Sequence, residues 1–169
     1  PNATTNVIFD LNATGNCSIN TAALALNITL ASGYTGTASI TNGNSLTVSG
    51  LLSQAGGSLN TNNQSLTLHS LYQSAGVLNL TDSAVSISGY LEHASGTLDA
   101  DTSSISLSGN ARQNITSGGT SLYDLTITNA NSNGIVFLDN LTVANSLTAV
   151  TASSVLTFAE GKYYYLNDL

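Results

Sequence analysis

A six-residue pattern of alternating apolar and hydroxyl side chains recurs along this chain at a nearly constant interval. It reads SLTVSG at residues 45–50, SLTLHS at 65–70, AVSISG at 84–89 and SISLSG at 104–109, with shorter copies DLTIT at 124–128 and NLTV at 140–143. The first apolar residue advances by 20, 19, 20 and 20 residues over the first five copies. Self-similarity at such a period predicts an all-β solenoid, a single-stranded parallel β-helix with coils of about 20 residues.

A second set of periodic positions keeps step with the first. Glycine recurs every 20 residues, and a leucine lies seven residues before the next copy of the pattern in three consecutive coils. These positions are Gly56, Gly76 and Gly96 for the glycines and Leu59, Leu78 and Leu98 for the leucines. Two columns with the same spacing indicate one continuous solenoid.

Alternation with a period of two predicts which side chains face the core. We expect the apolar residues of each copy to point inward, at Leu46, Val48, Leu66, Leu68, Val85, Ile87, Ile105, Leu107, Leu125 and Ile127. We expect the hydroxyl residues to form an outward ladder of Thr47, Thr67, Ser86, Ser106, Thr126 and Thr142.

The copies divide the chain into two parts within a single domain. Residues 1–44 lack the clean period, and we expect them to form an N-terminal cap or an assembly segment. Residues 45–169 are expected to form the solenoid coils, regular as far as residue 119 and looser beyond it.

The charge content excludes several classes of partner. Charged residues make up only 7% of the chain, against roughly 25% in ordinary globular proteins. The two cations, Arg112 and Lys162, are too few for a basic patch, so we expect neither nucleic acid nor an anionic lipid surface as a partner. No apolar run approaches the roughly 20 residues of a membrane-spanning helix, and we expect no membrane insertion. Cys17 is alone and is expected to be a small buried residue, with an intermolecular bridge or a reactive thiol as alternatives.

The acidic residues include one closely spaced pair, Asp99 and Asp101. A glycosidase needs two carboxylates flanking the scissile bond, but Asp99 aligns with Asn60 and Asn79, each directly after a periodic leucine. Asn and Asp side chains bond local backbone in turns, so a turn-closing ladder is favoured over a weak Ca²⁺ ligand or a catalytic group. We predict no enzymatic activity, no catalytic residue, no metal and no cofactor.

The two histidines occupy different columns, which argues against a shared metal. His69 aligns with Ser88, whereas His93 aligns with Ser53 and Gln73. We expect both imidazoles to be ordinary exposed side chains.

Eight Asn-X-Ser/Thr sequons occur, a mild excess over random placement. They lie at Asn2, Asn12, Asn16, Asn27, Asn63, Asn79, Asn114 and Asn140. Such sites are acceptors for glycan on secreted chains, so they are candidate N-glycosylation sites in the extracellular or cell-surface protein that we expect.

Both ends of the chain carry apolar, strand-like segments. NVIFDL at residues 6–11 contains Val7, Ile8 and Phe9, and the last segment contains Tyr163, Tyr164 and Tyr165, of which Tyr164 should face opposite to the other two. A solenoid needs a polar cap on its terminal repeat, and none is evident. Either the natural protein continues or these strands mediate assembly.

The later part of the chain resembles a known repeat. SGNARQNITSGGTSLYDLTITNA at residues 108–130, GIVFLDNLTVANSLT at 134–148 and LTFAEGKYY at 156–164 are similar to a repeat of large microbial surface proteins with parallel β-helix folds. The earlier copies resemble the coils of filamentous-haemagglutinin-type adhesins and autotransporter passengers. The resemblance implies extracellular, non-enzymatic display or adhesion and supplies no catalytic residues.

These observations predict a structural protein, a secreted or cell-surface β-solenoid that self-associates through strand contacts into a filament or surface layer. An adhesin segment that binds host or carbohydrate surfaces is one alternative. Ice binding through the Thr/Ser ladder is another, and a polysaccharide-degrading enzyme is the least favoured.

Overall fold

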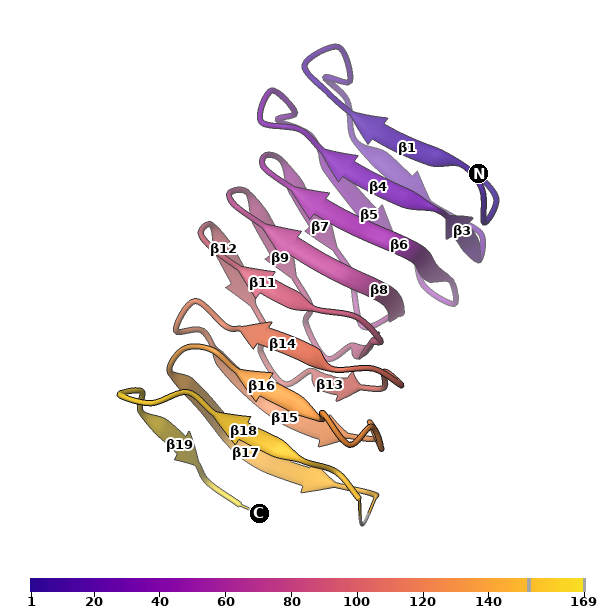
Figure 1. The fold of residues 1–169 in the computed structure, drawn as a ribbon. Coiled ribbons are helices and arrows are strands. Elements are labelled where there is room, and N and C mark those ends of the chain that lie inside the picture. Colours follow the sequence, from indigo (N-terminus) through magenta and orange to yellow (C-terminus); the bar gives the residue numbers. More distant parts are fainter. Residues whose placement is uncertain (152, 169) are drawn as a thin grey trace.

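The computed structural model describes residues 1–151 and 153–168, and it confirms the predicted β-solenoid. The chain makes about eight turns with a spacing of about 21 residues, and its described residues include no helix. All paired strands are parallel. The coils stack along one axis, so that the N- and C-termini lie at opposite ends of the stack (Figure 1).

Three faces surround the core, and each is a column of stacked strands. Face 1 contains β1 (Asn6–Phe9), β4 (Asn27–Leu30), the second half of β6 (Ser45–Gln54), the second half of β8 (Ser65–Gln73), β11 (Leu91–His93), β14 (Gln113–Thr116), β16 (Ile135–Phe137) and β18 (Leu156–Phe158). Face 2 contains β3 (Ala23–Ala25), the first halves of β6 and β8, β10 (Ala84–Ile87), β13 (Ser104–Leu107), β15 (Ser121–Ile127) and β17 (Leu141–Ala149). Face 3 contains β2 (Cys17–Ile19), β5 (Thr37–Ile40), β7 (Ser58–Asn60), β9 (Val77–Asn79) and β12 (Thr97–Asp99). The last strand, β19 (Tyr164–Leu166), pairs with the start of β17.

The predicted core is confirmed. All ten residues expected to point inward are buried, the most exposed being Val85 at 3%. Each such side chain contributes about 1.5–3 kcal/mol when it is fully buried. Because neighbouring coils place these residues in register, the core is one continuous apolar cluster.

Residues 1–44 form coils of the same solenoid. The face 1 core positions Val7, Ile28 and Leu52 are paired in register although they lie 21 and 24 residues apart. Face 3 likewise pairs Cys17 with Ala38. The turns of these coils differ in length, and this hides the period in the sequence while the strands keep their alignment. Residue 45 therefore marks no change of fold.

A column of glycines closes the turn between face 1 and face 3. Gly57, Gly76 and Gly96 have φ angles of 56°, 78° and 100°. A Cβ on Gly76 would lie 2.7 Å from the Gly57 carbonyl oxygen, and one on Gly96 would lie 2.8 Å from that of Gly76. The sequence alignment had placed Gly56 in this column; the register of the following strands shows that Gly57 occupies it.

We predict that Gly76→Ala costs several kcal/mol of unfolding free energy, because it adds a clash with neighbouring backbone to the strain of positive φ. Gly43 is a matched control, since its φ is also 78° and no atom lies within 4 Å of its ideal Cβ. Gly43→Ala should therefore cost only about 1 kcal/mol. Urea unfolding followed by circular dichroism measures both, and equal losses would contradict the crowding argument.

Candidate functional site

The outward hydroxyl ladder exists, with one member reassigned. Five predicted residues are in register on face 2, and none is buried: Thr47, Thr67, Ser86, Ser106 and Thr126.

Thr142 is not part of this ladder; it pairs with Ser121, and the residue opposite Thr126 is Thr148. The register shifts between Leu122 and Asp124. This irregularity moves the NLTV copy into an earlier part of its coil.

The columns beside the ladder are mixed. Ser104 lies between Ala84 and Asp124 in one of them. On the other side His69 Nδ1 and Ser88 Oγ are 3.0 Å apart. The face is therefore rich in hydroxyl groups but lacks a uniform repeat in its outer columns.

The two ends carry most of the exposed apolar surface. Twelve large hydrophobic residues are exposed in the described chain, and nine of them belong to the first or last coils. These nine are Ile8, Leu11, Leu24 and Leu26 at the N-terminal end and Val150, Val155, Phe158, Tyr163 and Tyr165 at the C-terminal end.

The predicted assembly strands lie at these ends. In β1, Val7 and Phe9 are half-buried and pack against the core, whereas Ile8 is 65% exposed. A cavity of about 200 Å³ opens into the core beside β1, and Cys17 lines it as a half-buried free thiol. Among its other lining residues is Ala23. The apolar core is therefore accessible at the N-terminal end.

The tyrosines at the other end alternate as predicted. Tyr164 packs against the core and donates a hydrogen bond to the Phe137 carbonyl at 3.3 Å, whereas Tyr163 and Tyr165 are exposed. The Phe158 ring stacks on Phe137 with centroids 5.3 Å apart and meets Tyr164 edge-on at 4.6 Å. The C-terminal end thus presents an aromatic layer.

A column of buried polar side chains runs along one corner of the core. Gln54 and Gln73 are fully buried and in register, and His93 follows Gln73. The Nε2 group of Gln54 donates to the Val77 carbonyl at 2.9 Å, and that of Gln73 donates to the Thr97 carbonyl at 2.9 Å. Each amide thereby ties face 1 to the start of the face 3 strand in the next coil.

The prediction that His93 is exposed is wrong, because its side chain is only 5% exposed. Its column also contains Gln54 rather than Ser53, since β6 has one extra residue at its corner, between Val48 and Leu51, relative to β8. A signal was present in the sequence: a polar residue with two hydrogen-bonding groups stands three positions before each column glycine.

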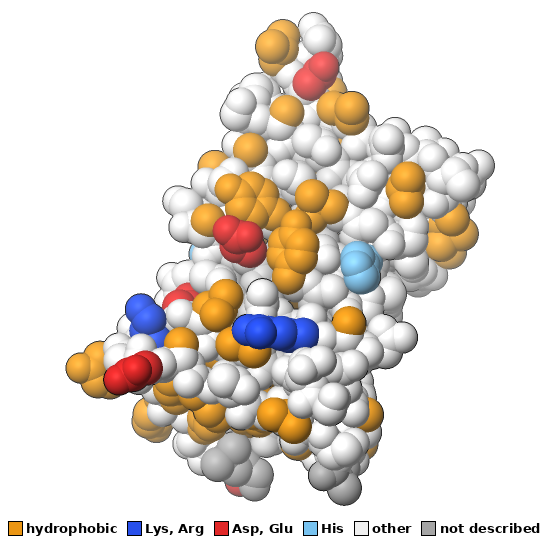
Figure 2. Space-filling model, viewed as in Figure 1, with side chains coloured by type: hydrophobic (Ala, Val, Ile, Leu, Met, Phe, Trp, Pro, Cys, Tyr) orange, Lys and Arg blue, Asp and Glu red, His pale blue; other side chains and the backbone are white. Residues whose placement is uncertain are grey.

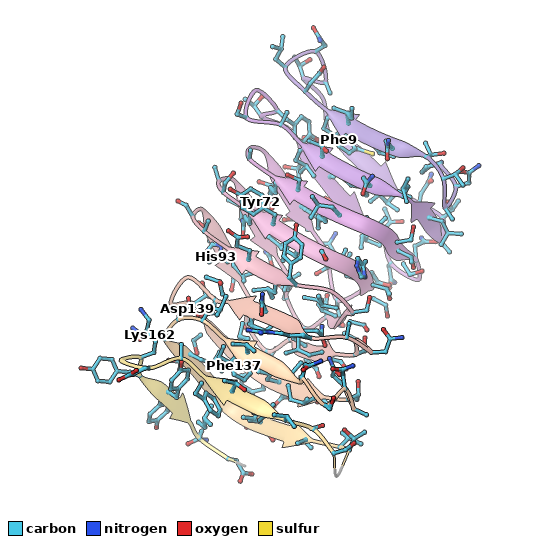
Figure 3. The ribbon with its side chains drawn as sticks, in the orientation of Figure 1. Phe9, Tyr72, His93, Phe137, Asp139 and Lys162 are labelled. Carbon is cyan, nitrogen blue, oxygen red and sulfur yellow. The ribbon has the colours of Figure 1, made fainter. Side chains whose placement is uncertain are left out.

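His93, Ser117 and Asp139 lie on successive coils, but they do not form a catalytic triad. The coil that carries Ser117 lies between the coil of His93 and the coil of Asp139. Its hydroxyl is fully buried and donates to the Asn140 carbonyl at 2.8 Å. Asp139 accepts backbone N–H bonds from Ser117 at 3.0 Å and Gly118 at 2.7 Å. His93 and Asp139 share one corner of the stack (Figure 3). A nucleophile needs a base beside an accessible hydroxyl, so this group is structural.

Burial lowers the pKa of His93, and the negative charge of Asp139 partly opposes that shift. Among the residues that the structure describes, the buried Nδ1 has no hydrogen-bond partner. The imidazole is therefore neutral in the folded protein at neutral pH.

We predict that His93 makes the fold less stable in mild acid. Because the folded-state pKa is lower than that of the unfolded chain, about 6.5, the unfolded state takes up the proton first and stability falls as the pH drops below that value. His93→Gln, which extends the glutamine column, should reduce the loss of melting temperature between pH 7 and pH 5. His69→Gln on the exposed side should leave that loss as in the wild type. The same pH dependence in wild type and His93→Gln would refute the assignment.

The predicted column forms, and Asn79 and Asp99 close turns in it. Asn60, Asn79 and Asp99 are in register on face 3. Asn79 Oδ1 accepts the Thr81 N–H at 3.0 Å, and Asp99 Oδ1 accepts the Asp101 N–H at 3.3 Å. Within residues 1–151 and 153–168, no group of three or more His, Cys, Asp or Glu residues is placed to hold a metal ion.

Six of the eight sequon asparagines are exposed, and Asn27 and Asn79 are half-buried. The Asn27 amide is engaged on both sides: its Nδ2 donates to Asn6 Oδ1 at 2.9 Å, and its Oδ1 accepts the Leu51 N–H at 2.7 Å. The exposed sequons other than Asn114, which accepts a hydrogen bond from Arg112, are therefore the ones with amides best placed for modification.

Comparison with protein-family models, curated proteins and solved structures finds no match to this chain. No helix in the described residues is long and apolar enough to cross a membrane.

Proposed function

We propose that this chain is a non-enzymatic structural protein, a secreted or cell-surface β-solenoid whose copies stack end to end in a filament or surface layer. The observation that carries the proposal is the concentration of exposed apolar side chains at the two ends. Exposed apolar surface of this kind is typical of interaction sites. The exposed sequons and the scarcity of charge are consistent with an extracellular, glycan-bearing surface.

The backbone at each end supports strand addition. In a parallel ladder the N–H and C=O of successive residues point to opposite neighbours. The Phe9 carbonyl accepts the Ala31 N–H at 2.8 Å, so the backbone N–H and C=O of Ile8 point to the open side of β1. At the end of β18, the Ala159 N–H donates to the Phe137 carbonyl at 3.0 Å, so the backbone N–H and C=O of Phe158 point to the open side of β18.

These two open edges are complementary because they belong to the same face. A second copy whose β1 pairs with β18 continues face 1 in the same direction. Its Phe9 then lies over the exposed end of the apolar core. Its open N-terminal core would then cover the aromatic layer of Phe158 and Tyr164. Strand addition of this kind uses main-chain hydrogen bonds for affinity. A head-to-tail contact that does not close extends into a filament.

We predict that the chain assembles at high concentration and that Ile8→Pro prevents assembly. Proline removes the Ile8 N–H at the open edge, and edge strands tolerate proline, so the coil should stay folded. Ile8→Thr keeps the N–H and is the control. Light scattering and negative-stain microscopy measure filament formation. A wild-type chain that stays monomeric, or an Ile8→Pro variant that assembles normally, would contradict the proposal.

The in-register Thr/Ser ladder gives ice binding a specific basis as a second candidate. Its regular strand spacing of about 4.7–4.9 Å supports the idea, whereas Ala84, Asp124 and His69 interrupt the neighbouring columns. If the ladder binds ice, the protein should show thermal hysteresis that Ser106→Tyr abolishes. Hysteresis absent from the wild type would dismiss this candidate.

A further inference from the structure

A groove in the middle coils runs from the corner between face 2 and face 1 onto the outer surface of face 1. One part, about 460 Å³ in volume, is lined by residues that include His69, Tyr90, Asn110 and Arg112. A second part of about 360 Å³ includes Glu92, Thr116 and Leu138. Both parts are lined by Tyr90 and Asn114, so they lie side by side and are treated together as one groove. With coils about 4.8 Å apart, it extends for roughly 15–20 Å along the stack.

The groove contains most of the exposed apolar surface that lies away from the ends. Outside the terminal coils, the large hydrophobic residues exposed in the described chain are Val77, Tyr90 and Leu138, and the last two line the groove. Half-buried Tyr72, which pairs with Glu92, lies on the same face (Figure 3). Aromatic rings with a polar edge are favoured in binding sites.

Arg112 gives the groove a positive charge in a chain whose formal net charge is −7. Its Nε donates to Asn114 Oδ1 at 3.2 Å, which orients the guanidinium within the groove. In the part of the chain that the structure describes, no hydrogen bond or ion pair occupies its terminal N–H groups. The only other cation in the sequence, Lys162, lies in the segment between β18 and β19, and the two blue side chains form separate patches in Figure 2.

The composition of this groove identifies the chemistry of its ligand. Backbone groups in the middle of a sheet are already paired, so a peptide would find no main-chain partners on this face. The amide and hydroxyl side chains of the groove instead match ligand hydroxyl groups, which both donate and accept hydrogen bonds. The guanidinium of an arginine matches a carboxylate. We propose that the groove binds an acidic saccharide, with its carboxylate on Arg112, a sugar ring on Tyr90 and ring hydroxyls on Asn114 and Glu92.

This site is independent of end-to-end assembly, because its lining residues belong to interior coils and not to β1 or β18. A failure of saccharide binding would leave the assembly proposal intact. Loss of assembly in Ile8→Pro should, in turn, leave saccharide binding unchanged.

Isothermal titration calorimetry with an oligogalacturonate tests the proposal. Arg112→Gln and Tyr90→Ala should each weaken binding about tenfold or more, and Lys162→Gln should have no effect. Glu92→Gln removes a repulsive charge and should strengthen binding a few-fold. Raising the salt concentration should weaken binding to the wild type more than to Arg112→Gln.

Melting curves establish that the variants remain folded, which is expected since Arg112 and Tyr90 are exposed. Three outcomes would overturn the proposal: no binding of oligogalacturonate at millimolar concentration, equal binding by wild type and Arg112→Gln, or equal affinity for a neutral maltooligosaccharide.

Discussion

The hydrogen-bond ladder between successive coils is the constraint on which the rest of this structure depends. Because strands on a face are parallel and in register, each position of a coil lies over the equivalent position of the next. Stacking in register produces columns of one chemistry: apolar from Val7 to Phe158 inside face 1, and hydroxyl from Thr47 to Thr126 outside face 2. On face 1 the described ladder ends at β1 and β18, and the proposed assembly rests on these two strand edges.

Columns that repeat strictly were predictable from the sequence. The inward positions around Ile105 and the turn column of Asn79 and Asp99 follow from spacing alone, since strand alternation and turn chemistry are local. Errors arose where a coil gains or loses a residue. The irregularity in β15 displaced Thr142 from the expected ladder, and the corner of β6 misaligned the column of His93. An alignment that assumes a constant spacing between coils cannot detect such insertions.

The face 1 groove could not be inferred from the sequence, because its members come from different columns. Arg112 precedes a strand, Tyr90 lies at a corner, and Leu138 follows the strand of another coil. Only the stacking of coils of unequal length brings them together. The periodic part of a solenoid thus forms the scaffold, and coils of unequal length create surface features that do not repeat.

The buried glutamines have a consequence for how the chain finds its alignment. Stacked leucines are nearly interchangeable, so apolar columns alone would tolerate a coil that pairs two residues out of register with its neighbour. Gln54 and Gln73 oppose such a slip, since their amide N–H groups meet backbone carbonyls at the turn, chiefly those of Val77 and Thr97. A coil that paired out of register would leave a buried amide without these acceptors, at a cost of about 1–3 kcal/mol. In a fold built from near-identical layers, these two side chains therefore favour one alignment along the strands.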